Sequence, residues 1–140
     1  MNTKTNIPPD CDAVVKRPKP PDIRSRAFQY ALRAIKLYQH LQGQRDGAAW
    51  VLGKQYLRSA CSVGANIEES QSGESRADFV HKLGIAEKEA RASLYWLRLI
   101  AGSGIVQTRK LDPLTKETEE LIAVVASIIL STKGKKPRAA

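Results

Sequence analysis

An apolar pattern with the period of an α-helix, clearest between residues 79 and 101, is the feature that most constrains the fold. The pattern repeats at spacings of three and four residues and consists of Phe79, Leu83, Ala86, Ala90, Leu94, Leu97 and Ala101. Side chains at these spacings lie on one face of a helix, so the face is predicted to point into a core. Ser75 and Asp78 precede it as a capping box with Asp in place of Glu. We therefore expect a helix that follows Ser75 and ends near Ala101.

Two further helices are predicted before this one. The first should run from about residue 23 to residue 41 with Asp22 as its N-cap, and the second from about residue 48 to residue 72 with Asp46 as its cap. Four residues of the first helix are predicted to face the core, namely Phe28, Leu32, Ile35 and Tyr38. Their spacings of four, three and three residues suit one helical face.

A fourth helix is predicted near the end of the chain, with Asp112 as its cap and Pro113 at its first helical position. Its inward stripe should consist of Leu114, Thr118, Leu121, Val125 and Ile128. No segment shows the alternation of a strand bounded by turn residues. The chain is therefore predicted to be all-α, an antiparallel up-down-up-down four-helix bundle.

The fourth helix is apolar on more than its inward face, because Ile122, Val124 and Ile129 are apolar as well. A helix that is apolar nearly all round needs cover on more than one side. In a lone bundle this surface would be exposed, so these three residues are predicted to form an oligomer interface.

The second helix carries polar residues where a plain bundle helix would carry leucines. One helical stripe holds Ser59, Ser62, Asn66 and Glu69. Either this stripe faces water, or Asn66 is buried and forms a hydrogen bond with Lys88 or Glu89 on the third helix. The second interpretation makes Ser62, Asn66, Glu69 and Glu89 a structural polar network.

Four motifs follow one another in the chain: Ser62-Val-Gly-Ala-Asn-Ile-Glu-Glu-Ser70, Asp78-Phe-Val-His-Lys-Leu83, Lys88-Glu-Ala-Arg91 and Leu94-Tyr-Trp-Leu97. Together they resemble the four helix bundle protein family, whose first members were found encoded in intervening sequences of bacterial large-subunit (23S) ribosomal RNA genes. That family also looks like the accessory protein of diversity-generating retroelements, a basic pentameric barrel. The resemblance covers roughly residues 24–130 and implies a four-helix bundle assembled as a homopentamer. Gly64 stands where many relatives have Pro.

The formal net charge of +9 over 140 residues is concentrated near the two ends of the chain. Residues 1–26 have a net charge of +3 and residues 133–140 of +4, which leaves +2 for residues 27–132. A basic total indicates nucleic acid as a partner, although this distribution weakens the indication for the bundle itself. We expect a disordered, proline-rich basic arm at residues 1–21, the bundle at residues 22–132 and a basic tail at residues 133–140.

Basic residues are in excess at the start of the predicted bundle, with seven basic and one acidic side chain between Arg24 and Arg58. Residues 59–132 instead contain eight basic and ten acidic side chains. One stripe of the first helix holds Arg26, Gln29, Arg33, Lys36 and His40, and Lys54 and Arg58 share a face of the second helix. This surface is either a solvated face that keeps the protein soluble or a ridge that binds phosphate.

A second basic stripe is expected on the third helix, and it consists of Lys88, Arg91, Tyr95 and Arg98. Basic residues interleaved with an aromatic ring suit RNA, because bases stack on such rings. In the alternative interpretation, Tyr95 and Trp96 pack on a neighbouring helix or subunit and Arg91 pairs with Glu87.

Residues of the kinds needed for catalysis or metal binding do not converge in the sequence. Neither His40 nor His81 has an evident nucleophile with an orienting partner, and Asp78-x-x-His81 is a single pair where a di-iron bundle needs two Glu-x-x-His pairs. Cys11 and Cys61 lack metal-ligand spacing. We therefore expect a protein that is not an enzyme, without catalytic residues, metal or cofactor.

Membrane association is not expected. The longest apolar stretch, residues 121–130, is shorter than the ~20 residues that a membrane span needs. The polar, proline-rich start does not resemble a signal peptide. These features favour a cytoplasmic protein.

The expected function is non-catalytic binding of structured RNA by an oligomeric bundle, through phosphate contacts without base specificity. The candidate contact residues are Arg26, Arg33, Lys36, Lys54, Arg58, Lys88, Arg91 and Arg98. The alternative is a protein-interaction scaffold or accessory subunit, whose partner is a nucleic-acid enzyme such as a reverse transcriptase. A near-neutral bundle with basic ends fits that alternative almost as well.

Overall fold

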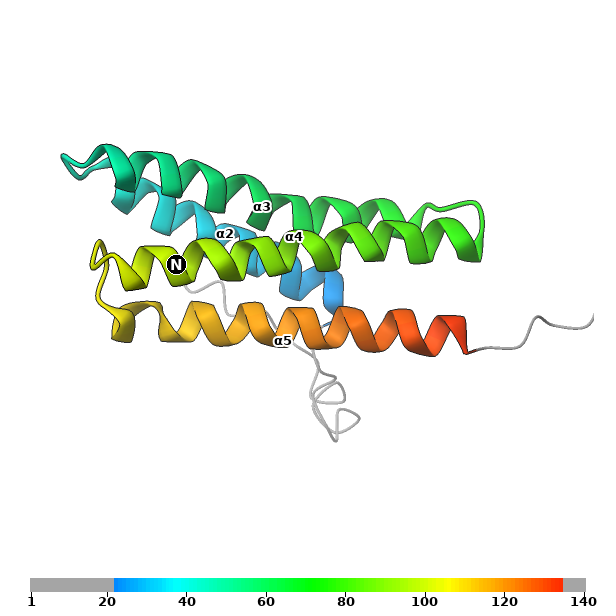
Figure 1. The fold of residues 1–140 in the computed structure, drawn as a ribbon. Coiled ribbons are helices and arrows are strands. Elements are labelled where there is room, and N and C mark those ends of the chain that lie inside the picture. The colour runs from blue at the N-terminus through cyan, green and yellow to red at the C-terminus, as the bar shows by residue number, and fades with distance from the viewer. Residues whose placement is uncertain (1–21, 135–140) are drawn as a thin grey trace, which may run out of the picture.

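Four antiparallel helices form a bundle in the computed structural model, which describes residues 22–134 (Figure 1). They are α2 (Ile23–Gln42), α3 (Gly47–Gln71), α4 (Arg76–Gly102) and α5 (Thr108–Lys133). Consecutive helices pack against each other, and α5 closes the bundle against α2. The described residues contain no strand, so the predicted all-α four-helix architecture is confirmed. The pentamer stays a prediction. The arm expected at residues 1–21 and residues 135–140 of the expected tail lie outside the described residues.

Three helices begin at the caps that the sequence predicts. The side chains of Asp22, Asp46 and Ser75 each accept a hydrogen bond from a backbone N–H two or three residues later, at 2.9, 2.9 and 3.0 Å. Such bonds satisfy donors that have no partner in the first helical turn. The expected bounds of these helices lie within one residue of the observed ones.

Helix α5 begins earlier than predicted. It starts at Thr108, after Gln107, which makes no capping hydrogen bond with its side chain, and Pro113 lies inside the helix. The prediction that Asp112 caps this helix is therefore wrong. Leu111 is only 3% exposed, and the burial of its side chain stabilises the helical turn that precedes the proline. The proline removes one backbone donor from the ladder but does not prevent the earlier turn.

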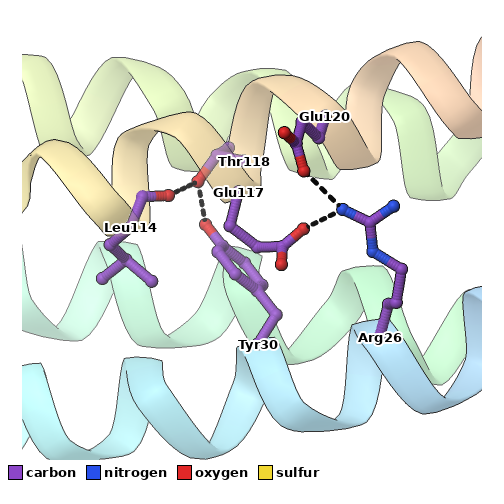
Figure 2. Close-up of polar contacts among 6 residues, drawn as sticks. All are labelled: Arg26, Tyr30, Leu114, Glu117, Thr118 and Glu120. Atoms are coloured by element: carbon purple, nitrogen blue, oxygen red, sulfur yellow. Dashed lines mark hydrogen bonds and ion pairs between the residues drawn. The ribbon is translucent and has the colours of Figure 1, made fainter. Parts of the chain in front are cut away.

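A layer of buried hydroxyl groups crosses the middle of the bundle and joins all four helices. Tyr56 donates to the hydroxyl of Tyr30 at 3.0 Å, and Tyr30 pairs with Thr118 at 2.6 Å. Thr118 in turn donates to the carbonyl of Leu114 (Figure 2). The remaining members of this polar layer are Ser59 of α3 and Ser93 of α4, whose hydroxyls lie 2.9 Å apart. Burial raises the pKa of both tyrosines, so they stay neutral and can donate.

The buried face of α2 differs from the predicted one. Ala27, Tyr30, Ala34 and Leu41 are buried, whereas Phe28, Leu32 and Ile35 are 59%, 41% and 37% exposed. The predicted inward stripe of α2 is therefore wrong. Small residues line the contact with α3, where a Cβ on Gly64 would be in van der Waals contact, at 3.6 Å, with the carbonyl oxygen of Ala27. A face of larger side chains would hold these two helices farther apart.

The predicted inward stripes of α4 and α5 are largely correct. On α4, Leu83, Ala86, Ala90 and Leu97 are buried, and Ser93 and Ile100 complete the stripe where Leu94 and Ala101 were expected. On α5, the predicted stripe is buried except at its end, where Ile129 takes the place expected for Ile128. None of the four described helices is long and apolar enough to cross a lipid bilayer.

Candidate nucleic-acid interface

The polar layer divides the bundle into two halves that differ in charge. The half that we call the basic half comprises residues 31–58 and 94–117, with nine basic and three acidic side chains. The other described residues, 22–30, 59–93 and 118–134, form the acidic half, with seven basic and nine acidic side chains. The α2–α3 and α4–α5 connections lie together at the end of the basic half, and the α3–α4 connection lies at the opposite end (Figure 1). The fold thus gives the bundle a net charge of +6 in one half and −2 in the other.

All nine basic side chains of the basic half are exposed. They are Arg33, Lys36, Arg45, Lys54, Arg58, Arg98, Arg109, Lys110 and Lys116. None of them forms an ion pair with any residue between 22 and 134. Exposed cations without carboxylate partners are available to a polyanionic ligand.

The cations that do form ion pairs belong to the acidic half. Lys82 bonds Glu69 at 2.9 Å, and Arg91 bonds Glu87 at 3.2 Å within α4. Arg24 lies 3.9 Å from Asp22. The two halves therefore differ in how their cations are compensated as well as in their net charge.

Arg26, which the sequence placed on the phosphate-binding stripe, is held by two carboxylates of α5. Its Nη2 donates to Glu117 and, at 2.7 Å, to Glu120 (Figure 2). The hydrogen bond to Glu117 is the main cause of its raised pKa. Only 23% of the Arg26 side chain is exposed. Arg26 therefore stabilises the α2–α5 contact and is not an unpaired cation, because α5 places two carboxylates opposite it.

The other predicted contact residues fall into two groups. Arg33, Lys36, Lys54, Arg58 and Arg98 belong to the basic half. Lys88 and Arg91 of α4 lie in the acidic half, where Lys88 is exposed and Arg91 is paired. The structure thus gathers five of the eight predicted residues and separates three from them.

Four basic residues of this surface were missed by the sequence prediction, namely Arg45, Arg109, Lys110 and Lys116. Residues 94–117 belong to the long segment 59–132, in which acidic side chains outnumber basic ones, and this average conceals their cations. A signal was present, since residues 90–111 contain four basic and no acidic side chains. The α4–α5 hairpin brings this stretch to the end that α2 and α3 share.

The predicted polar network on α3 and α4 does not form as one unit. Asn66 donates within its own helix, to the carbonyl and hydroxyl oxygens of Ser62 at 2.9 and 3.1 Å. Glu69 accepts a hydrogen bond from Lys82 of α4. One carboxylate oxygen of Glu89 is buried and has no hydrogen-bond partner among the described residues. The predicted bond from Asn66 to Lys88 or Glu89 is therefore wrong, and the Ser59–Ser93 pair links the two helices instead.

The predicted oligomer interface on α5 needs a correction at one residue. Ile129 is only 9% exposed and packs with Val125 in the core of the acidic half, so it cannot also face a second subunit. Ile122 and Val124 are half-buried, and their contact with another subunit stays a prediction. Larger exposed apolar side chains lie on α2, and one of them, Phe28, lines a groove of about 170 Å³ between α2 and α3. Phe28 and Ala31 of α2 and Cys61 and Ala65 of α3 line it.

Within residues 22–134, no three His, Cys, Asp or Glu residues are grouped so that they could hold a metal ion. Cys61 lies on the wall of the apolar groove, where partial burial raises the pKa of its thiol and disfavours the reactive thiolate.

Comparison with known proteins identifies the family. A family profile described as 23S rRNA-intervening sequence protein matches residues 21–127. A protein from Bacteroides thetaiotaomicron with a known crystal structure, described as having unknown function and belonging to the S23 ribosomal protein family, is 35% identical in sequence. The alignment covers 77% of this chain and 98% of that one, with a TM-score of 0.73. No curated protein matches. The four-helix architecture and the match over most of the bundle agree, and the chain belongs to the 23S rRNA-intervening sequence protein family.

Proposed function

We propose that the protein is a non-catalytic RNA-binding bundle whose basic half contacts the phosphates of structured RNA. The observation that carries this proposal is that all nine cations of the basic half are exposed and form no ion pair with a described residue. Such a cation binds phosphate without first breaking an ion pair, and each contact releases counterions condensed on the RNA. Contacts of this kind position RNA but read no sequence.

The separation of charge supports RNA binding at one local surface over nonspecific electrostatic binding to the whole protein. At physiological ionic strength, salt screens exposed charges beyond ~8 Å, so the sign of the nearby surface decides where a polyanion binds. The basic half combines a net charge of +6 with the two connections at one end of the bundle. RNA is expected there and not on the acidic half.

The protein is further proposed to act as a homo-oligomer, and the family resemblance suggests a pentamer. The exposed apolar stripe of α2, which consists of Phe28, Leu32 and Ile35, and the groove that Phe28 lines support assembly, because apolar surface gathered on a soluble bundle commonly marks an interface. Several copies would present several basic halves to one RNA. Weak contacts on single subunits would then add up to a higher avidity.

Charge reversal tests the RNA proposal. Arg33→Glu with Lys36→Glu should abolish binding to a hairpin RNA, measured by fluorescence anisotropy over a series of salt concentrations. For the unaltered protein, the logarithm of affinity should fall with the logarithm of salt by roughly 0.7–0.9 per phosphate contact. The matched control is Lys88→Glu with Lys133→Glu, which makes the same charge change on two exposed lysines of the acidic half.

The control pair should bind RNA nearly as well as the unaltered protein. Equal losses in both double variants would show that only total charge matters and would contradict a local site. Deleting residues 1–21 and 135–140 completes the test, because these segments contain seven of the 23 basic residues. If that deletion alone removes all binding, the flanking segments bind RNA and the bundle does not.

A protein-interaction scaffold is the second candidate function, and the apolar groove between α2 and α3 favours it. A partner such as a nucleic-acid enzyme would supply the chemistry. Phe28→Asp places a charge on the groove at a side chain that is 59% exposed, so it should leave the helical content unchanged. Loss of a protein complex in this variant, with RNA affinity retained, would support the scaffold. Loss of RNA affinity together with dissociation of the oligomer would favour the avidity model.

A further inference from the structure

Tyr95 on α4 is an exposed aromatic ring in the basic half whose position no packing requirement explains. It is 52% exposed, and its hydroxyl forms no hydrogen bond with the residues that the structure describes. The buried stripe of α4 runs through Ser93, Leu97 and Ile100, on a different face. The ring is therefore available to a ligand at the surface.

The ring of Tyr95 is nevertheless supported. It packs against the ring of Trp96 in an edge-to-face arrangement, with centroids 5.3 Å apart and an angle of 65° between the planes. Trp96 is half-buried and packs against the hydrophobic core of the basic half. A ring supported in this way loses little freedom when a planar group stacks on its open side.

Basic side chains flank Tyr95 on the exposed face of α4. Arg91 precedes it by one helical turn and Arg98 follows by three residues, so the three side chains share one face. Arg98 has no ion-pair partner in the described part of the chain, and Arg91 shares its charge with Glu87. No acidic residue occurs from Ala90 to Leu111, so no carboxylate of this segment repels a polyanion.

These surroundings fit a nucleotide better than an apolar protein surface. A protein interface would extend the apolar contact, but only Leu99, at 36% exposure, is a large exposed apolar neighbour on α4. The most exposed apolar side chain of α2, Phe28, lines the α2–α3 groove instead. An exposed aromatic ring between arginines matches an unpaired nucleotide, whose base stacks and whose phosphates bind cations.

We propose that Tyr95 stacks on an unpaired base of the bound RNA, while Arg98, which has no ion-pair partner among the described residues, contacts an adjacent phosphate. This inference rests on the proposed RNA-binding function and specifies the RNA: it contains unpaired nucleotides, in a loop, a bulge or an end. Paired bases stack on each other inside a duplex and offer no free face along its length. An RNA with an unpaired loop should therefore bind more tightly than a fully paired duplex of the same length.

Two substitutions at Tyr95 separate the ring from its hydroxyl. Tyr95→Ala should weaken binding to a hairpin with a loop of uridines by roughly fivefold or more, the lower limit for losing one base–aromatic stack. It should leave affinity for a blunt-ended duplex of equal length unchanged. Tyr95→Phe should bind both RNAs as the unaltered protein does. The dependence of affinity on salt should not change in Tyr95→Ala, because no phosphate contact is lost.

Leu130→Ala is the control, since Leu130 is a large exposed apolar side chain of the acidic half that does not line the groove, and it should not affect binding to either RNA. Thermal unfolding shows whether each variant is folded. The inference is overturned if Tyr95→Ala retains full affinity for the hairpin, or if Tyr95→Phe loses as much as Tyr95→Ala. If the unaltered protein binds duplex and hairpin equally, only the stacking inference fails. If it binds neither RNA at low salt, the proposed function fails as well.

Discussion

At the scale of single residues, Tyr30 makes the contacts that join three of the four helices. Its hydroxyl accepts from Tyr56 and pairs with Thr118, and the two tyrosine rings meet edge to face with centroids 6.4 Å apart. The sequence predicted that Thr118 faces inward but did not identify Tyr30. A tyrosine suits both a buried and an exposed position, and only the hydroxyls on other helices decide between them.

Thr118→Val keeps the shape of the side chain and removes the acceptor that Tyr30 uses. A buried hydroxyl left without a partner costs about 1–3 kcal/mol, so the free energy of unfolding in urea should fall by about this amount. Thr132→Val is the control, because the Thr132 hydroxyl bonds only the carbonyl of Ile128 one turn earlier. Equal stability of the two variants would show that the polar layer does not contribute in this way.

At the scale of helices, local signals located three helix starts but did not fix every helical face. Asp22, Asp46 and Ser75 cap helices as predicted because a cap depends on residues next to each other in the chain. The predicted inward face of α2 was wrong because this helix has two apolar stripes with helical spacing. The pattern favoured the stripe with the larger side chains. The close approach of α3 at Gly64 selects the stripe of small residues, and that approach depends on tertiary structure.

Two aspartates that the sequence predicted as helix caps, Asp46 at α3 and Asp112 at α5, can be compared directly. Asp46→Ala removes a side chain that accepts from the N–H groups of Ala48 and Ala49, and it should lower the free energy of unfolding by about 1 kcal/mol. Asp112→Ala should change it by less than about 0.5 kcal/mol, because Asp112 lies inside α5 and is exposed. Urea denaturation measures both values. A cost at Asp112 as large as that at Asp46 would mean that α5 starts at Asp112 after all.

At the scale of the whole molecule, the arrangement of the helices creates the candidate interface. An up-down-up-down topology was predicted, and it already implies that residues 31–58 and 94–117 share one half of the bundle. Along the chain, however, the cations of residues 94–117 follow the acidic side chains of residues 59–93, so the charge of consecutive segments hides the contribution of α4 and α5. Which cations are neutralised was beyond sequence reasoning, since Arg26 is paired only because α5 places Glu117 and Glu120 opposite it.

Lysine reactivity measured with and without RNA tests the central claim most directly. Bound phosphates should shield lysine amines from acetylation, and mass spectrometry reports each site separately. The account predicts protection in the basic half at Lys36, Lys54, Lys110 and Lys116, all of which are exposed in the free bundle. Lys88 and Lys133, exposed in the acidic half, should react equally in both samples. Protection that is equal in the two halves, or confined to the acidic half, would contradict the account.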